Sequence, residues 1–94
     1  MAEITPELRS EIKKLVVETL NLKDVDPEKI LDEPSFFTGE NTITLDSIDA
    51  IELIMAVQRT FGVRLDDQNL ARNIINSVNS IAEFIVTEKE KNPA

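Results

Sequence analysis

The chain has 94 residues, a formal net charge of −8 at pH 7, and neither cysteine nor histidine. The absence of cysteine excludes disulfides, thiolate metal sites and a thiol nucleophile. The absence of histidine removes the most common general base and metal ligand. This length predicts one domain over residues 1–94. These absences argue against most enzyme classes. No catalytic constellation appears along the chain either, so we expect no catalytic residues, no metal site and a protein that is not an enzyme.

The negative charge is concentrated in the central third of the chain. Residues 24–52 hold nine acidic residues and Lys29 as the sole basic residue, whereas the segments on either side are neutral. Nucleic acids and anionic membrane surfaces repel such a chain, so we expect no nucleic acid among its partners. The acidic segment is either a solubilising loop or a docking surface for basic partners.

The start of the chain lacks the basic stretch and the apolar segment of a signal peptide. The longest apolar run, Leu53 to Val57, is far too short to span a bilayer. We therefore expect a cytoplasmic protein without a membrane span, and we expect it to be a monomer.

Residues 6–20 are predicted to form the first helix, because Thr5 suits the N-cap, Pro6 suits the first helical position and apolar residues then recur at helical spacing. Between Asn21 and Leu45 this periodicity fails, which predicts a long loop with one helical turn at residues 26–28. Loops of this length in small domains are usually functional or partly disordered. The residues expected to hold the loop against the core are Phe36, Phe37, Ile43 and Leu45.

The second helix is predicted to begin at Asp46 and to end at about Phe61. Asp46 suits the N-cap, Asp49 can complete a capping box, and Gly62 suits the left-handed residue after a helix. Apolar residues cover more than half of its circumference, so we expect this helix to be packed on several sides. Its expected core residues are Ile51, Leu53, Ile54, Met55, Val57 and Phe61.

Two further helices are predicted in the rest of the chain. Asp66 and Asp67 can cap a brief third helix, and Ser77 can cap a last helix that ends at about residue 86, before a frayed tail over 87–94. The predicted fold is all-α: a small four-helix bundle with three longer helices, one short helix, and the long loop between the first two. The apolar residues of the last two helices are Leu70, Ile74, Ile75, Val78, Ile81, Ala82 and Ile85.

Two kinds of ligand site fail on spacing. A calcium loop counted from Asp24 needs glycine at its sixth position and glutamate at its twelfth, where the chain has Lys29 and Ser35. Gly39 and Gly62 are the only glycines, which excludes a glycine-rich phosphate loop.

Ser47 opens the second helix, where free backbone N–H groups and the positive end of the helix dipole favour an anion such as a phosphate. Taken alone, it is most simply an ordinary serine at a helix start. The sequence around it changes this interpretation. Residues 43–53 read Ile-Thr-Leu-Asp-Ser-Ile-Asp-Ala-Ile-Glu-Leu.

This segment closely resembles the modification site of acyl carrier proteins, in which Leu-Gly-x-Asp-Ser-Leu-Asp precedes Val-Glu-Leu and an amphipathic helix. The resemblance extends to Phe-Gly-Val at 61–63, to the last helix at 77–85, and to Ser-Phe at 35–36. It covers about residues 6–86 in the order that the family has.

The resemblance implies that Ser47 receives a 4′-phosphopantetheine from coenzyme A, transferred by a phosphopantetheinyl transferase (holo-carrier synthase) with Mg²⁺. The terminal thiol of this arm carries acyl groups as thioesters, in fatty-acid or in specialised lipid or polyketide biosynthesis. Acyl-handling enzymes with basic docking patches are the other expected partners. The residues to which partner recognition is carried over are Asp46, Ile48, Asp49 and Glu52.

Departures from the family pattern indicate a specialised carrier. Thr44 replaces the common glycine, and Ser35 lies 12 residues before Ser47 instead of the usual nine. Arg59, with its neighbours Gln58 and Thr60, stands where fatty-acid carriers are typically acidic.

Two alternatives stay open: an aminoacyl or peptidyl carrier, and an unmodified helical interaction module. The intact Asp-Ser-Ile at 46–48 argues against the second, because nothing structural demands it.

Overall fold

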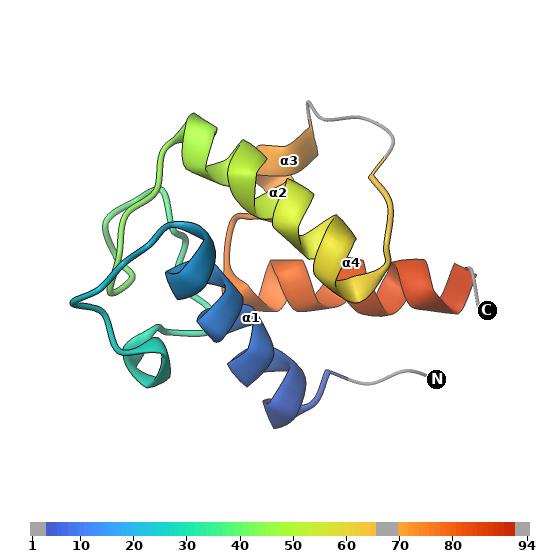
Figure 1. Ribbon diagram of the computed structural model, residues 1–94, viewed down its shortest axis with the longest axis horizontal. Helices are drawn as coiled ribbons and strands as arrows, with labels where there is room; N and C mark the ends of the chain where they lie inside the picture. The colour runs from blue at the N-terminus through green and yellow to red at the C-terminus, as the bar shows by residue number, and fades with distance from the viewer. Residues whose placement is uncertain (1–3, 66–69, 92–94) are drawn as a thin grey trace.

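A computed structural model describes residues 4–65 and 70–91 of the chain. Over these residues the fold contains four α-helices and a 3₁₀ turn, and no strand, so the prediction of an all-α four-helix fold is confirmed (Figure 1). Three helices are long and α3 is a single turn. The elements are α1 (Pro6–Thr19), η1 (Pro27–Lys29), α2 (Ser47–Phe61), α3 (Ala71–Ile74) and α4 (Val78–Lys91).

The helices enclose one apolar core. α1 packs against both α2 and α4, and the short α3 contacts α2 and α4 on the other side. Each fully buried Leu, Ile or Val side chain stabilises the fold by roughly 1.5–3 kcal/mol relative to leaving it exposed. Among the largest buried side chains are Ile12, Val16, Leu53, Ile54, Val57, Ile75, Val78, Ile81 and Ile85.

The first helix begins where the sequence predicts it. Thr5 adopts an extended conformation and its hydroxyl accepts the backbone N–H of Leu8 at 3.1 Å. The helix ends at Thr19, one residue before the predicted end, and Asn21 then takes a left-handed conformation with φ 54°. Asparagine tolerates this conformation better than most residues, so it allows the chain to turn into the long loop.

The long loop is held in place by the side chain of Asn41, which is 8% exposed. Its carbonyl oxygen accepts the backbone N–H groups of Leu31 (2.9 Å) and Thr42 (2.7 Å). Its amide nitrogen donates to the backbone oxygens of Leu31 (3.0 Å) and Pro34 (2.9 Å). One side chain therefore satisfies four backbone groups that the irregular loop leaves without helical partners.

The loop is also fixed to the bundle by its apolar residues, as predicted. Phe36 and Leu45 are buried, and Phe37 and Ile43 pack partly buried against the core. The N–H of Phe36 donates to the backbone oxygen of Asn76 at 2.7 Å, between α3 and α4, and the N–H of Leu45 donates to the oxygen of Phe36 at 2.8 Å. These hydrogen bonds connect the loop that leads into α2 with the segment between α3 and α4.

Two of the residues expected in the core of α2 lie on the surface. Ile51 is 43% exposed and Met55 is 48% exposed, whereas Leu53 and Ile54 are fully buried. The prediction that α2 is packed on several sides is therefore wrong for one face. The reason is that α2 packs chiefly against α1 and α3, which leaves its remaining face to solvent.

The last two helices differ from the prediction in detail. Leu70 lies at the N-cap of α3 without a side-chain hydrogen bond, and the predicted caps at 66–67 lie outside the described residues. The Ser77 hydroxyl accepts the N–H of Ser80 at 3.1 Å, as expected for a cap. α4 continues to Lys91, whereas the predicted end was at about residue 86. Glutamate and lysine, which alternate over 88–91, are good helix formers.

Candidate functional site

Ser47 is the first residue of α2, and its position is fixed by the acidic residues on either side of it. Asp46 is the N-cap, and its Oδ1 accepts the backbone N–H of Asp49 at 2.9 Å. In return, Oδ2 of Asp49 accepts the N–H of Asp46 at 3.2 Å. The predicted capping box is therefore confirmed. Both carboxylates define the helix start, which fixes the backbone at the serine.

The serine side chain itself is exposed and free. Ser47 is in the exposed class, and within residues 4–65 and 70–91 its hydroxyl makes no hydrogen bond. Leu45, two residues before it, is buried at 7% exposure, and Ala50, three residues after it, is buried at 1%. An accessible hydroxyl thus stands between two anchored residues.

α2 presents a continuous face to solvent beyond this serine. At about 100° per residue, five residues fall within one arc of the helix that lies opposite Leu53 and Val57. Ile48 is 68% exposed, and the other four members are also exposed. We call this face the α2 stripe; it consists of Ile48, Ile51, Glu52, Met55 and Arg59.

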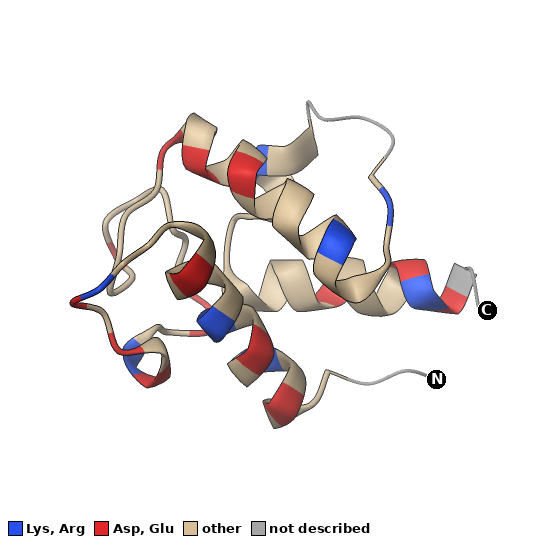
Figure 2. Cartoon of the chain, in the orientation of Figure 1, with Lys and Arg blue, Asp and Glu red and all other residues tan. Residues whose placement is uncertain are grey.

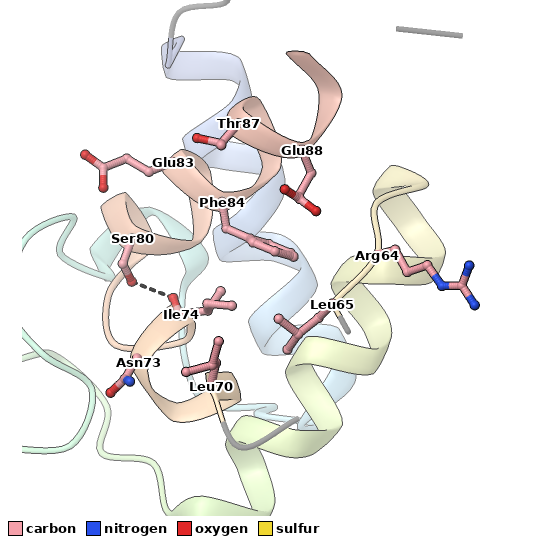
Figure 3. A pocket seen from close by; sticks show the side chains of 10 residues that line it. All are labelled: Arg64, Leu65, Leu70, Asn73, Ile74, Ser80, Glu83, Phe84, Thr87 and Glu88. Atoms are coloured by element: carbon pink, nitrogen blue, oxygen red, sulfur yellow. Dashed lines mark hydrogen bonds between the residues drawn. The ribbon is translucent and has the colours of Figure 1, made fainter. Parts of the chain in front are cut away.

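A separate groove of about 510 Å³ lies between the link after α2, α3 and α4 (Figure 3). Leu65, Leu70, Ile74 and Phe84 form its apolar lining, and Arg64 lies at its edge. No residue of α2 lines this groove, and the lining residues Arg64 and Leu65 follow the C-terminal end of α2, whereas Ser47 is at the N-terminal end. A 15-residue helix separates these ends by about 21 Å along its axis. The groove is therefore distinct from the site at Ser47.

Comparison with known proteins identifies the family of this fold and site. The family model described as "Phosphopantetheine attachment site" matches residues 42–85, from just before Ser47 into α4. An acyl carrier protein of Thermosynechococcus vestitus is 35% identical over 79 residues, which cover 84% of this chain and 88% of that protein. The chain belongs to the acyl carrier protein family.

Other acyl carrier proteins give similar matches. One from Buchnera aphidicola subsp. Schizaphis graminum is 31% identical over 84 residues, which cover 89% of this chain and 96% of the relative. One from Bradyrhizobium sp. (strain ORS 278) is 36% identical over 79 residues, which cover 84% and 90%. The resemblance that the sequence indicates around residues 43–53 therefore extends over most of the chain.

Membership in the acyl carrier protein family, together with the attachment-site match, implies covalently attached 4′-phosphopantetheine as the cofactor. The start of α2 fits such a group. The Ser47 hydroxyl is exposed and unused, and the first backbone N–H groups of a helix favour a phosphate. Within residues 4–65 and 70–91 no helix is long and apolar enough to cross a membrane.

The sequence-predicted site residues lie together on the first two turns of α2. Asp46, Ile48 and Glu52 are exposed, whereas Asp49 is half-buried and is used in the capping box. Sequence reasoning missed that Ile51 and Met55 continue this surface. No signal in the sequence separates them from the buried apolar residues of α2, because apolar residues cover more than half of the circumference of this helix.

Proposed function

We propose that this acyl carrier protein holds acyl intermediates as thioesters on a 4′-phosphopantetheine arm attached to Ser47. The observation that supports the proposal most is the exposed Ser47 hydroxyl at the first position of α2, inside the segment that matches the attachment-site family. The chain has no cysteine, so the arm would supply the thiol on which the acyl group travels. The chain itself carries cargo and performs no catalysis.

Attachment joins the Ser47 oxygen to the phosphorus nearest the pantetheine part of coenzyme A. The serine O–P bond forms, the bond from that phosphorus to the adenosine bisphosphate part breaks, and the hydroxyl proton leaves to a base. A phosphopantetheinyl transferase with Mg²⁺ is the proposed catalyst, because the described residues near Ser47 include no base other than carboxylates. What this chain contributes is an oxygen held at a fixed helix start.

Partner enzymes are proposed to approach over the N-terminal half of α2. Asp46 and Glu52 offer exposed negative charge, and Ile48 offers an exposed apolar side chain between them. These features suit the transferase and acyl-handling enzymes with basic docking patches. Asp49 acts chiefly by fixing the helix start, since its carboxylate already accepts a backbone N–H.

The pathway proposed is a specialised one within fatty-acid, lipid or polyketide biosynthesis. Arg59, which is exposed, supports this reading because the corresponding face of fatty-acid carriers is typically acidic. We also propose a monomer that acts in the cytoplasm, since the acidic chain is repelled by anionic membrane surfaces.

The test is intact mass after incubation with coenzyme A, Mg²⁺ and a broad-specificity phosphopantetheinyl transferase. We expect the wild type to gain the mass of one phosphopantetheine and Ser47→Ala to gain nothing. Ser10→Ala, a serine variant on α1, is the matched control and should gain the arm. An unmodified wild type, or a modified Ser47→Ala, would overturn the proposal. Loading the modified protein with acyl and with aminoacyl groups then separates the two cargo classes.

A further inference from the structure

The exposed charges along α2 change sign between its two ends (Figure 2). Asp46 and Glu52 lie toward the N-terminal end, Arg59 lies in the last turn, and Arg64 follows on the link after the helix. Glu52 and Arg59 are seven residues apart, which places them on the same face of the helix and about 10 Å apart along its axis. Met55, 48% exposed, lies between them. From Glu52 through Met55 to Arg59, the α2 stripe therefore offers a partner a negative, an apolar and a positive part in that order.

The two arginines at this end differ from the other two arginines of the chain. Arg9 donates from Nε to Oδ1 of Asn79 at 3.0 Å, and the guanidinium of Arg72 lies 4.9 Å from the centre of the Phe37 ring. Arg59 and Arg64 are exposed, and in the described part of the chain neither joins an ion pair or a hydrogen bond. Two arginines thus hold the fold together, and two are available to another molecule.

The helix dipole does not account for both of these available arginines. A cation in the last turn of a helix is stabilising, which explains Arg59 in part. Arg64 lies outside α2, which ends at Phe61 with Gly62 in the left-handed conformation. That effect is confined to the last turn, so it does not apply to Arg64.

We propose that the α2 stripe, together with Asp46 at the helix start and Arg64 after the helix, is a two-signed docking surface for an enzyme that acts on the carried group. The enzyme would present basic residues to Asp46 and Glu52, an apolar contact to Met55, and a carboxylate to Arg59 or Arg64. Arginine suits a carboxylate partner because its planar guanidinium can bind both oxygens. The same two cations repel an enzyme whose docking face is basic throughout, so they select partners by repulsion as well as by attraction.

This inference rests on the proposed function, because it takes enzymes to approach α2 in order to reach the arm on Ser47. The experiment therefore begins with protein whose modification is already established by mass. A chain that never gains the arm contradicts the proposed function before docking is measured. A modified chain with the wrong docking behaviour contradicts the present inference alone.

The probe is an acyl-loading synthetase whose docking face is uniformly basic. It is used unaltered and as a set of single variants, in each of which one basic residue of that face is changed to Glu. The carriers are the wild type, the double variant Arg59→Glu/Arg64→Glu, and the matched control Lys14→Glu/Lys23→Glu. The control makes the same change in net charge at exposed positions on α1 and the turn after it. For each pair we would measure kcat/KM, and Kd with a catalytically inactive form of the probe.

We expect the unaltered probe to use Arg59→Glu/Arg64→Glu about two- to tenfold better than wild type at low salt, with a smaller gain for the control. At least one Glu variant of the probe should reverse this order and bind wild type more tightly than the double variant. The difference should shrink as salt is raised, because the charges involved are exposed. The inference would be overturned if kcat/KM rose equally for the double variant and the control, or if it did not rise for the double variant. It would also be overturned if no variant of the probe reversed the order.

Discussion

Asp46 and Asp49 each accept the backbone N–H of the other, at 2.9 and 3.2 Å, and Ser47 lies between them in the sequence. Asp46 caps α2 and also carries an exposed negative charge, so its contribution to the stability of the fold can be measured separately from its contribution to recognition by partner enzymes. Asp46→Ala removes the cap and should lower the free energy of unfolding by about 1 kcal/mol. Asp46→Asn keeps an acceptor oxygen and should lose much less. Urea denaturation measures both values.

The same two variants also report on the charge of Asp46, since both remove it. We expect both to be modified more slowly than wild type by the transferase. If Asp46→Asn is modified at the wild-type rate while Asp46→Ala is slow, the aspartate acts through the cap and its charge contributes nothing to recognition.

The conformation of the long loop should depend on Asn41, because this side chain makes four hydrogen bonds to the loop backbone. Asn41→Ala leaves partly buried backbone groups without their protein partners, so we expect a loss of about 1–3 kcal/mol in the free energy of unfolding. Asn73→Ala, at an exposed position on α3, is the matched control and should change stability little. Equal losses in the two variants would show that Asn41 does not hold the loop.

The start of α2 could be predicted from sequence because its signals are local. Asp46, Asp49 and Gly62 act on neighbouring backbone groups, so spacing alone specifies the capping box and the end of the helix. The position of Ser47 as the first residue of the helix follows directly. Its modification stays a prediction, since it depends on an enzyme and not on the fold.

The features that sequence reasoning missed depend on contacts between distant segments. Whether Ile51 and Met55 are buried is decided by which helices pack against α2, and an apolar residue looks the same on either face. Asn41 forms hydrogen bonds with Leu31 and Thr42, which are near it in the sequence. Only the folded loop, however, brings their backbone groups around one side chain. Polar residues in loops carry no periodicity from which such a role can be inferred.

The exposed apolar residues of the α2 stripe should contribute little to folding. Serine and isoleucine have similar helix propensities, so Ile51→Ser should change the free energy of unfolding by less than about 1 kcal/mol. Leu53→Ala, two residues along and fully buried, should cost about 2–5 kcal/mol. Denaturant unfolding of both variants checks the contrast. A loss at Ile51 comparable to that at Leu53 would mean that Ile51 is packed in solution.

Cargo on the arm should raise the stability of the protein if its chain enters the core. The core is closed, with Leu53, Ile75 and Ile81 fully buried, so the helices must part to admit an acyl chain. The short α3, which has no side-chain cap, is the element best able to move. Burial contributes at most about 0.8 kcal/mol per CH₂, so Tm should rise with chain length from the unloaded, arm-bearing form upward.

The groove beside α3 is an alternative location for the acyl chain, and one variant distinguishes this groove from the core. Leu70 is 46% exposed and lines the groove, so Leu70→Ser should reduce the rise in Tm only if the acyl chain lies there. We expect the rise to persist in this variant. Equal Tm values for all chain lengths in the wild type would place the cargo in solvent.

Docking of the transferase should depend on the negative end of the α2 stripe, and Glu52 is the residue at which this can be tested most cleanly. Unlike Asp49, it takes no part in the capping box, so Glu52→Lys should leave Tm nearly unchanged. Exposed charge pairs are worth about 0–1 kcal/mol, which corresponds to a loss of up to about fivefold in the rate of modification, chiefly through association. The rate of modification should also depend less steeply on salt concentration.

Glu11→Lys makes the same charge change at an exposed position on α1 and should slow modification less. Equal slowing in the two variants would make net charge the cause, and unchanged rates in both at low salt would mean that the acidic residues serve solubility and not docking.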